Sequence, residues 1–204
     1  MKKKLEIGLL VDDLKLNELN QDIISNIVEL KVCDKFLLIK QNLPKSNFIS
    51  YLKKYSILRL IEKVLIKSIF WFEKTVLSRF FNLKYKFKRI DISSVTKEIL
   101  DVHPRISKSG FFYEYNDDDI ENIQRKNLDV IIRLGSGIIR GKMLSVAKNG
   151  IFSFHHGDNE FFRGGPPGFW EVYFKKPLTG FVIQQLNEVL DGGKIIFKGQ
   201  VETK

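Results

Sequence analysis

The chain has 204 residues, of which 44% are hydrophobic and 28% charged, a balance that excludes an intrinsically disordered protein. The net charge of +10 arises within residues 45–89, which hold 12 Lys or Arg and 2 acids, so a generally basic surface is also excluded. The length suits one well-buried domain over residues 1–204. The single cysteine, Cys33, cannot form an internal disulfide, and the first apolar run stops at Asp12-Asp13, too early for a secretory signal. We therefore expect a cytoplasmic protein.

The first 40 residues have the pattern of a β-α-β unit. A continuous apolar run over 5–11 predicts a buried strand. Apolar residues three and four positions apart predict a helix over 17–30, and a second apolar run predicts a strand over 36–39. This order of elements is typical of parallel sheets. We expect an α/β, Rossmann-like fold with a mostly parallel sheet flanked by helices.

The basic segment 45–89 is predicted to be a long amphipathic helical insert, formed by one helix or by two in tandem. Bulky apolar residues recur at three- and four-residue steps from Phe48 to Phe80, and a Lys or Arg falls between them about once per turn. These charges are too frequent for a transmembrane span. The helix could cover its own domain, attach to an anionic membrane surface, or bind nucleic acid. Nucleic acid is the least favoured of the three.

The remaining chain alternates strands and helices. The pattern predicts a strand over 90–93 that rejoins the sheet, a helix from Asp117 to about Asn127, a strand over 129–134, a short helix over 141–148, a strand over 151–154, and two final strands over 179–186 and 193–198. His155-His156-Gly157-Asp158 follows the strand 151–154 directly. In open α/β sheets, ligands bind outside the carboxyl ends of the strands, so we expect the chemistry there.

Three features carry candidate chemistry: the histidine pair, the tight loop Arg163 to Gly168, and Asp191 in a glycine-flanked turn. Glycine permits close backbone approach in such loops, and proline fixes the backbone. Each feature alone is more often structural than catalytic. A metal site built from His155, His156, Asp158 and Asp191 is a less favoured alternative, because adjacent residues on a strand point to opposite faces.

In their order and spacing, these features resemble the catalytic half of the formyltransferases, the family of methionyl-tRNA formyltransferase and glycinamide ribonucleotide formyltransferase. The matching stretches are Phe154-His155, Phe162-Arg163-Gly164, Thr179-Gly180 and Leu190-Asp191-Gly192-Gly193. The resemblance is strong over residues 129–199 and weak over 1–40. The sequence from Ser153 to Glu171 is similar to that of a bacterial formyltransferase-like subgroup, which we associate, by analogy, with surface polysaccharides or glycolipids.

The resemblance implies an enzyme that moves a formyl group from 10-formyltetrahydrofolate to an amine acceptor, an amino sugar or glycolipid intermediate. It implies that His155 stabilises the developing oxyanion, while Asp191 orients the histidine and helps to move the amine proton. It implies no metal. It places the folate against Arg133, Leu134, Gly135, Ser136, Gly137, Asn187 and Leu190, and the acceptor near Arg163, Gly164 and Gly165.

One position departs from the family pattern. The family has Asn two residues before the histidine, whereas this chain has Ser153, which offers one rotatable O–H on a shorter stem. Ser153 could be a catalytic donor in place of the amide, or the chain could be an impaired protein that binds its ligand without turnover. A methionyl-tRNA formyltransferase-like activity is a further alternative. Because the chain ends at Lys204 without a tRNA-binding domain, we expect a small or lipid-linked acceptor instead.

Overall fold

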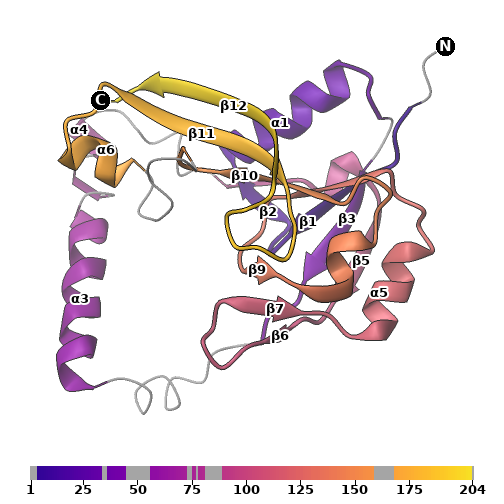
Figure 1. The fold of residues 1–204 in the computed structure, drawn as a ribbon, viewed down its shortest axis with the longest axis horizontal. Helices are drawn as coiled ribbons and strands as arrows, with labels where there is room; N and C mark the ends of the chain where they lie inside the picture. Colours follow the sequence, from indigo (N-terminus) through magenta and orange to yellow (C-terminus); the bar gives the residue numbers. More distant parts are fainter. Residues whose placement is uncertain are drawn as a thin grey trace.

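The computed structural model describes residues 4–33, 36–44, 56–72, 75–76, 78–80, 89–158 and 168–203 (Figure 1). Its centre is a seven-stranded sheet in the order β12-β11-β10-β8-β1-β3-β5. These strands are β1 (Ile7–Val11), β3 (Phe36–Gln41), β5 (Thr96–Val102), β8 (Val130–Arg133), β10 (Ile151–His155), β11 (Leu178–Gln185) and β12 (Lys194–Glu202). All neighbouring pairs from β10 to β5 are parallel, and only β11 and β12 join antiparallel. The predicted mostly parallel α/β fold is confirmed.

Helices lie on both faces of this sheet. They include α1 (Glu18–Glu29), α5 (Asp117–Gln124), the 3-10 helix η4 (Gly141–Ser145), α6 (Phe169–Tyr173) and, outside the sheet, α3 (Ile57–Phe72) and α4 (Ser78–Phe80). The side chains of Asn17 and Asn116 cap α1 and α5, because each accepts a hydrogen bond from a backbone N–H of the first turn. The helix α5 begins at Asp117 as predicted, after its N-cap Asn116, and ends at Gln124. The short helix predicted over 141–148 is a 3-10 helix that ends at Ser145.

Two small sheets complete the fold. One pairs β2 (Lys15–Asn17) with β4 (Arg89–Asp91), and the other contains β6 (Arg105–Ile106), β7 (Phe112–Glu114) and β9 (Ile138–Ile139). The prediction that the strand near residue 90 rejoins the main sheet was wrong. β4 pairs antiparallel with β2, and β5 takes the edge of the main sheet beside β3. The physical reason is that β4 is short and largely exposed, whereas β5 pairs along the whole length of β3.

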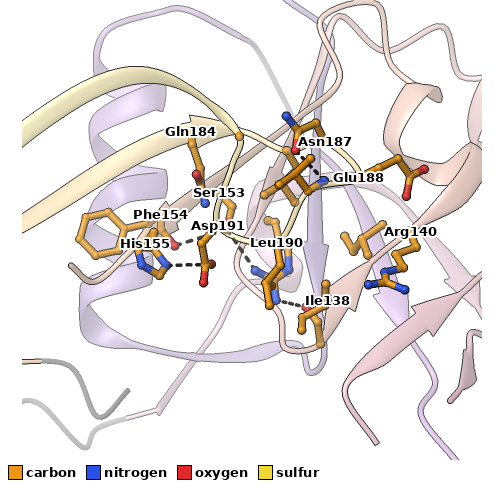
Figure 2. A pocket seen from close by; sticks show the side chains of 16 residues that line it. Ile138, Arg140, Ser153, Phe154, His155, Gln184, Asn187, Glu188, Leu190 and Asp191 are labelled. Atoms are coloured by element: carbon orange, nitrogen blue, oxygen red, sulfur yellow. Dashed lines mark hydrogen bonds and ion pairs between the residues drawn. The ribbon is translucent and has the colours of Figure 1, made fainter. Parts of the chain in front are cut away.

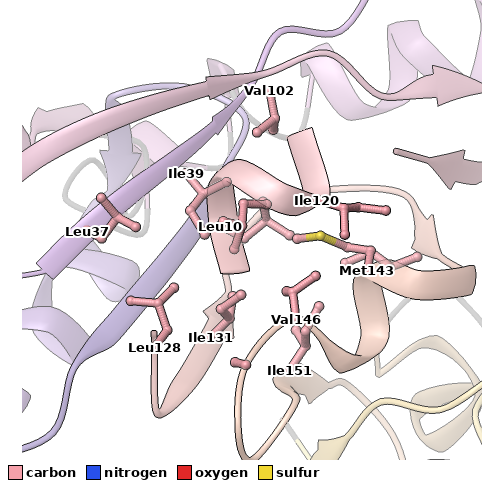
Figure 3. Close-up of a cluster of buried hydrophobic side chains, with 13 residues drawn as sticks. Leu10, Leu37, Ile39, Val102, Ile120, Leu128, Ile131, Met143, Val146 and Ile151 are labelled. Carbon is pink, nitrogen blue, oxygen red and sulfur yellow. The ribbon is translucent and has the colours of Figure 1, made fainter. Parts of the chain in front are cut away.

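The core consists of two hydrophobic clusters, one on each face of the sheet. Leu10 belongs to the cluster that also contains Ile120 of α5 and Met143 of η4 (Figure 3). Its neighbour Leu9 belongs to the other cluster, together with Ile24 of α1. Successive side chains of a strand point to opposite faces, so β1 is covered on both sides. This is why β1 is a continuous apolar run in the sequence.

None of the residues of α3 is buried, in contrast to α1, α5, η4 and α6, which each have at least one buried residue. The helix α3 stands to one side of the sheet in Figure 1. Only residues 56–72, 75–76, 78–80 and 89 of the segment 45–89 belong to the described chain, so the rest of the predicted insert lies outside it. Within the described ranges, no helix combines the length and the hydrophobicity needed to cross a membrane.

Candidate active site

The candidate site lies at the carboxyl ends of the parallel strands. β10 lies between β8 and β11, and it ends at His155. Alternation along β10 points Ser153 and His155 to one face of the sheet and Phe154 to the other. Ser153 is buried, whereas the Phe154 ring is exposed and stacks on Phe181. The sheet therefore directs the hydroxyl and the imidazole to the same side.

Asp191 lies in the turn that joins β11 to β12, and it has a positive φ of 52°. The Asn187 side chain fixes this turn, because it accepts a hydrogen bond from the Val189 amide and donates one to the Gly192 carbonyl. A Cβ atom at Gly193 would lie 2.5 Å from the Gln185 carbonyl oxygen, so only glycine fits at that position. The turn is thus held in a shape that presents Asp191.

Figure 2 shows that the end of β10 and the β11–β12 turn bring His155 and Asp191 together at one cavity. The Nδ1 atom of His155 lies 3.7 Å from the Oδ1 atom of Asp191, and the two side chains are 21% and 24% exposed. This distance exceeds a hydrogen bond and fits a weak ion pair or a contact through a water. The other ring nitrogen, Nε2, is buried and has no hydrogen-bond partner within the described chain. His155 can therefore offer Nε2 to a ligand.

Arg133, at the end of β8, contacts Ser153 across the strand pair. Its Nη1 atom donates a hydrogen bond to the Ser153 Oγ atom at 3.1 Å, and its Nη2 atom donates to the Gly137 carbonyl oxygen. The side chain is partly buried, and burial lowers the pKa of its guanidinium. The sequence interpretation assigned Arg133 only a contact with the folate, so its link to Ser153 is new.

A chain of polar contacts, absent from the sequence interpretation, lies beside Arg133. Tyr115 donates to Gln41, Gln41 donates to Asp12 at 2.8 Å, and Asp12 accepts from the Ser136 amide at 2.9 Å. Burial raises the pKa of the Tyr115 hydroxyl, so it remains a donor at neutral pH. The only signal in the sequence was the polar Asp12-Asp13 at the end of the first strand. Gln41 and Tyr115 gave none.

The predicted site residues fall into three groups: those that line this cavity, those that lie outside its lining, and those outside the described residues. Its lining includes Ser153, His155 and Asp191 together with Arg133, Gly137, Asn187 and Leu190 of the predicted folate contacts. Leu134, Gly135 and Ser136 are not in its lining; Gly135 and Ser136 instead approach Asp12. The predicted acceptor contacts Arg163, Gly164 and Gly165 lie outside the described residues.

The cavity also contains residues that motif reasoning missed. Arg140 and Glu188 line it, and Glu188 accepts a hydrogen bond from the Gly141 amide at 3.0 Å. Arg140 additionally lies over the Phe112 ring, 3.6 Å from its centre. Gln184, which pairs with Ser153 across the strands, is buried beside the site. Gln184 is identified by its position in the strand pairing, whereas Arg140 and Glu188 lie outside the strands, and no motif marks any of the three.

Asp158 and the second histidine do not join the site pair. Asp158 is buried, and its carboxylate lies 3.1 Å from the Lys198 ammonium, which neutralises it. His156 packs edge-on against Phe154. Across the described chain, which includes both histidines, Asp158 and Asp191, no group of three His, Cys, Asp or Glu side chains could hold a metal ion.

The fold with this site is that of the formyltransferases. Glycinamide ribonucleotide transformylase 1 from Symbiobacterium toebii is similar over 99% of this chain and 75% of its own, with a TM-score of 0.56 and 15% sequence identity. Phosphoribosylglycinamide formyltransferase from Bacillus halodurans is similar over 98% and 80%, with a TM-score of 0.54 and 15% identity. No protein-family model matches the sequence, and no curated protein is similar to it in sequence.

A formyltetrahydrofolate deformylase from Pseudomonas syringae pv. tomato has the same fold, with a TM-score of 0.51 and 12% identity over 98% of this chain and 52% of its own. These proteins carry out different reactions on one architecture. The formyltransferase-family fold predicted from the motifs is therefore confirmed, and the reaction must be argued from the site.

Proposed function

We propose that this chain is a formyltransferase that moves a formyl group from 10-formyltetrahydrofolate to an amine acceptor. The observation that carries the proposal is the meeting of His155, from the end of β10, and Asp191, from the β11–β12 turn, at one cavity on the carboxyl side of a formyltransferase fold. A histidine nitrogen without a partner in the described chain can donate to a developing oxyanion, and a carboxylate beside the histidine can move a proton, as acyl transfer uses them.

The residues present fit a bound formyl-folate. The buried Nε2 atom of His155 has no partner in the described chain and can donate to the formyl oxygen. Backbone around Gly137 and Leu190 lines the same cavity and can face a flat heteroaromatic ring. When bound, the folate would supply an activated formyl carbon. His155 thus offers a hydrogen-bond donor to the formyl oxygen, the atom on which negative charge develops during acyl transfer.

Each residue of the pair has a defined task in the balanced reaction. The amine nitrogen forms the new C–N bond, the bond to the folate nitrogen breaks, and one proton passes from the amine to the folate nitrogen. His155 donates a hydrogen bond to the formyl oxygen while it carries negative charge. Asp191 orients the imidazole from the Nδ1 side, by a weak ion pair or through a water, and accepts the amine proton before the proton passes to the leaving nitrogen.

An amino sugar or a lipid-linked amine is the proposed acceptor. A second cavity opens beyond β1 and is lined by Asp12, Asp13, Asn17 and Asn20 together with Arg89. Carboxylates and side-chain amides provide hydrogen bonds for hydroxyl groups and a counter-charge for an ammonium. Asp13 is already paired with Arg89 at 3.2 Å, so Asp12 is the residue better suited to meet a cationic acceptor.

The test is an assay of purified protein with 10-formyltetrahydrofolate and a panel of amines, in which tetrahydrofolate release and N-formyl product are both measured. Sugar amines, nucleotide-linked and lipid-linked, form the main arm, and aminoacylated tRNA forms the second. An arm without amine measures hydrolysis. Formyl product in the sugar arm supports the proposal. Folate binding without product in any arm would show the alternative, a binding protein that does not turn over.

We also propose that α3 attaches the protein to an anionic membrane surface. Arg59, Lys63 and Lys67 are spaced four residues apart and form one basic stripe along the helix. The opposite half carries exposed apolar residues, namely Ile57, Leu58, Ile61, Val64, Leu65, Ile69, Trp71 and Phe72, whereas the exposed Ile66 and Phe70 lie on the same side as the basic residues. Trp71, 66% exposed, lies at the edge of this apolar half, next to the basic stripe.

A wide apolar face beside a basic stripe is typical of helices that lie in the membrane interface. The segment 45–89 holds 12 basic residues against 2 acids, which complements an anionic surface. Such a location would present a lipid-linked amine to the site. A zwitterionic surface would use only the apolar half of the helix, and a nucleic acid would use only its positive charge.

A further inference from the structure

The Arg133 guanidinium is a partly buried cation without a carboxylate partner. Its Nε atom is fully buried and has no hydrogen-bond partner in the described chain, and its other contacts are the neutral Ser153 hydroxyl and the Gly137 carbonyl. No carboxylate among the described residues lies within ion-pair distance of it. A charge removed from water is costly unless an opposite charge compensates it. Asp12 acts on the guanidinium only through space, and the place of Arg133 in the cavity lining leaves it able to face a negative charge on a ligand.

The contact with Arg133 decides where the Ser153 proton points. A guanidinium has only donors, so Ser153 must use an oxygen lone pair to accept from Arg133 and is left with its own proton to donate. The acceptor in the structure is the carbonyl oxygen of Phe154 at 3.3 Å, longer than the usual O–H···O distance of about 2.7–2.8 Å. The proton is therefore weakly held and can turn to a better acceptor in the cavity.

Ser153 and His155 are both on the site face of β10, and both line the cavity. Figure 2 shows Ser153, His155 and Asp191 around one space. The hydroxyl proton of Ser153 and the Nε2 atom of His155 are thus two donors available to the same bound oxygen. Hydrogen bonds polarise one another when they form a chain, so a charged donor behind Ser153 strengthens the bond that Ser153 gives.

We propose that Arg133 and Ser153 act as one unit, in which Ser153 donates to the formyl oxyanion beside His155 and Arg133 positions and polarises the hydroxyl. This unit takes the role that the resemblance assigns to an asparagine side chain at position 153. Ser153 is the catalytic residue and Arg133 the positioning residue. The inference rests on the proposed formyl transfer, because the reaction supplies the oxyanion that the two residues would stabilise.

The kinetic test compares Ser153→Ala, Arg133→Met and the double variant. Each single change is expected to lower kcat by about 100-fold, as loss of one oxyanion donor does, with KM for the folate changed by less than about threefold. Because the two residues form one unit, the kcat of the double variant should lie within about threefold of the kcat of either single variant. If the loss of kcat in the double variant equals the product of the two single losses, the inference is wrong. It is also wrong if Ser153→Ala turns over at the wild-type rate.

A rescue variant separates a positioning role from a purely structural one. Ser153→Asn supplies an amide donor that does not depend on a neighbouring cation. Ser153→Asn is therefore expected to keep or raise wild-type turnover, and Arg133→Met/Ser153→Asn to recover at least tenfold over Arg133→Met. Melting temperatures and folate affinity of all variants identify any that fail to fold, and Arg133→Gln, which also removes the charge, replaces Arg133→Met if that variant is unstable. No recovery in a folded double variant would show that Arg133 has a structural role only.

A spectroscopic measurement keeps this inference distinct from the formyltransferase proposal. The carbonyl stretch of bound 5-formyltetrahydrofolate, labelled with carbon-13 at the formyl group, reports donation to the formyl oxygen without turnover. We expect a lower frequency in the wild type than in Ser153→Ala or Arg133→Met. If that shift occurs but no amine is formylated, the proposed function fails and the donor unit stands. If amines are formylated but the frequency is the same in all three proteins, the donor unit fails and the function stands. A wild-type protein that binds no folate would overturn both.

Discussion

The imidazole of His155 and the carboxylate of Asp191 face each other across 3.7 Å, one at the end of β10 and the other in the turn between β11 and β12. The distance is too long for a direct hydrogen bond, so a water or a small movement of the Asp191 turn must complete the contact. Neither side chain belongs to the hydrophobic core clusters, and both are partly exposed in the cavity lining. The pair can therefore be changed without unfolding the protein.

Replacing either member of this pair is expected to lower formyl transfer with little effect on stability. His155→Ala removes the oxyanion donor and Asp191→Asn removes the proton acceptor, so each should lower kcat by about 100-fold or more. The melting temperature should stay within about 2–3 °C of wild type, as for partly exposed positions outside the core. The measurement is initial rate and thermal unfolding on the same preparations. Near-wild-type turnover in either variant contradicts the assignment.

The shape of the Asp191 turn is expected to matter as much as the carboxylate. In Gly193→Ala, the new Cβ would lie 2.5 Å from the Gln185 carbonyl oxygen, so the turn must move and carry Asp191 with it. A displacement of about 1 Å costs roughly 100-fold in rate. The matched control is Gly110→Ala, which is strained at φ 85° but meets no atom within 4 Å. Both variants should be less stable than wild type, but only Gly193→Ala should lose activity. Equal activities would show that the turn is not positioned by Gly193.

His156 is expected to titrate below the ordinary range of histidine. Burial lowers its pKa, and the charge of His155 lowers the pKa further. Proton NMR of the three histidines should therefore give one low titration midpoint, which His156→Gln removes and so assigns. In His155→Ala, that midpoint should rise only slightly, since burial is the larger cause. A midpoint at or above that of an unfolded histidine contradicts this environment.

The same shift has a consequence for stability. The folded state binds the His156 proton more weakly than the unfolded state does, so protonation favours unfolding. The stability that the neutral form of His156 contributes to the folded state is fully present above the unfolded pKa of about 6.5. It is lost as the pH falls from there toward the folded pKa. His156→Gln should weaken the loss of stability over that range, measured by urea unfolding at several pH values.

Membrane attachment through α3 is expected to depend on its basic stripe. Wild-type protein should sediment with anionic vesicles at low salt, remain in the supernatant with zwitterionic vesicles, and lose binding as salt screens the charges. Arg59→Glu/Lys67→Glu should weaken binding at least about tenfold. The matched control, Lys31→Glu/Arg105→Glu, reverses two exposed charges outside the segment 45–89 and should bind as wild type does. Wild-type protein that stays in the supernatant with anionic vesicles at low salt rules out the attachment.

The elements that fill the centre of the sheet were predictable, because burial on both faces leaves an unbroken apolar run. β1, β3 and β8 each show such a run, and all three match the predicted strands within two or three residues. β5 was not predicted. It lies at the edge of the sheet, mixes Lys97, Glu98 and Asp101 with its apolar residues, and leaves Ile99 39% exposed. An edge strand needs less apolar surface, so its pattern is weaker.

The sequence by itself determined the type of fold and the two residues on which the proposed function rests. Apolar runs separated by amphipathic segments encode a parallel sheet, and His155 and Asp191 belong to motifs in a recognisable order. Only the tertiary structure placed Arg133 behind Ser153, and Gln41 and Tyr115 beside Asp12. Arg133 and Ser153 lie on adjacent strands, Gln41 of β3 reaches Asp12 just after the neighbouring β1, and Tyr115 approaches from the loop after β7. Local periodicity reports which face of a strand is buried, whereas side-chain partners depend on which strand lies next to it and in what register.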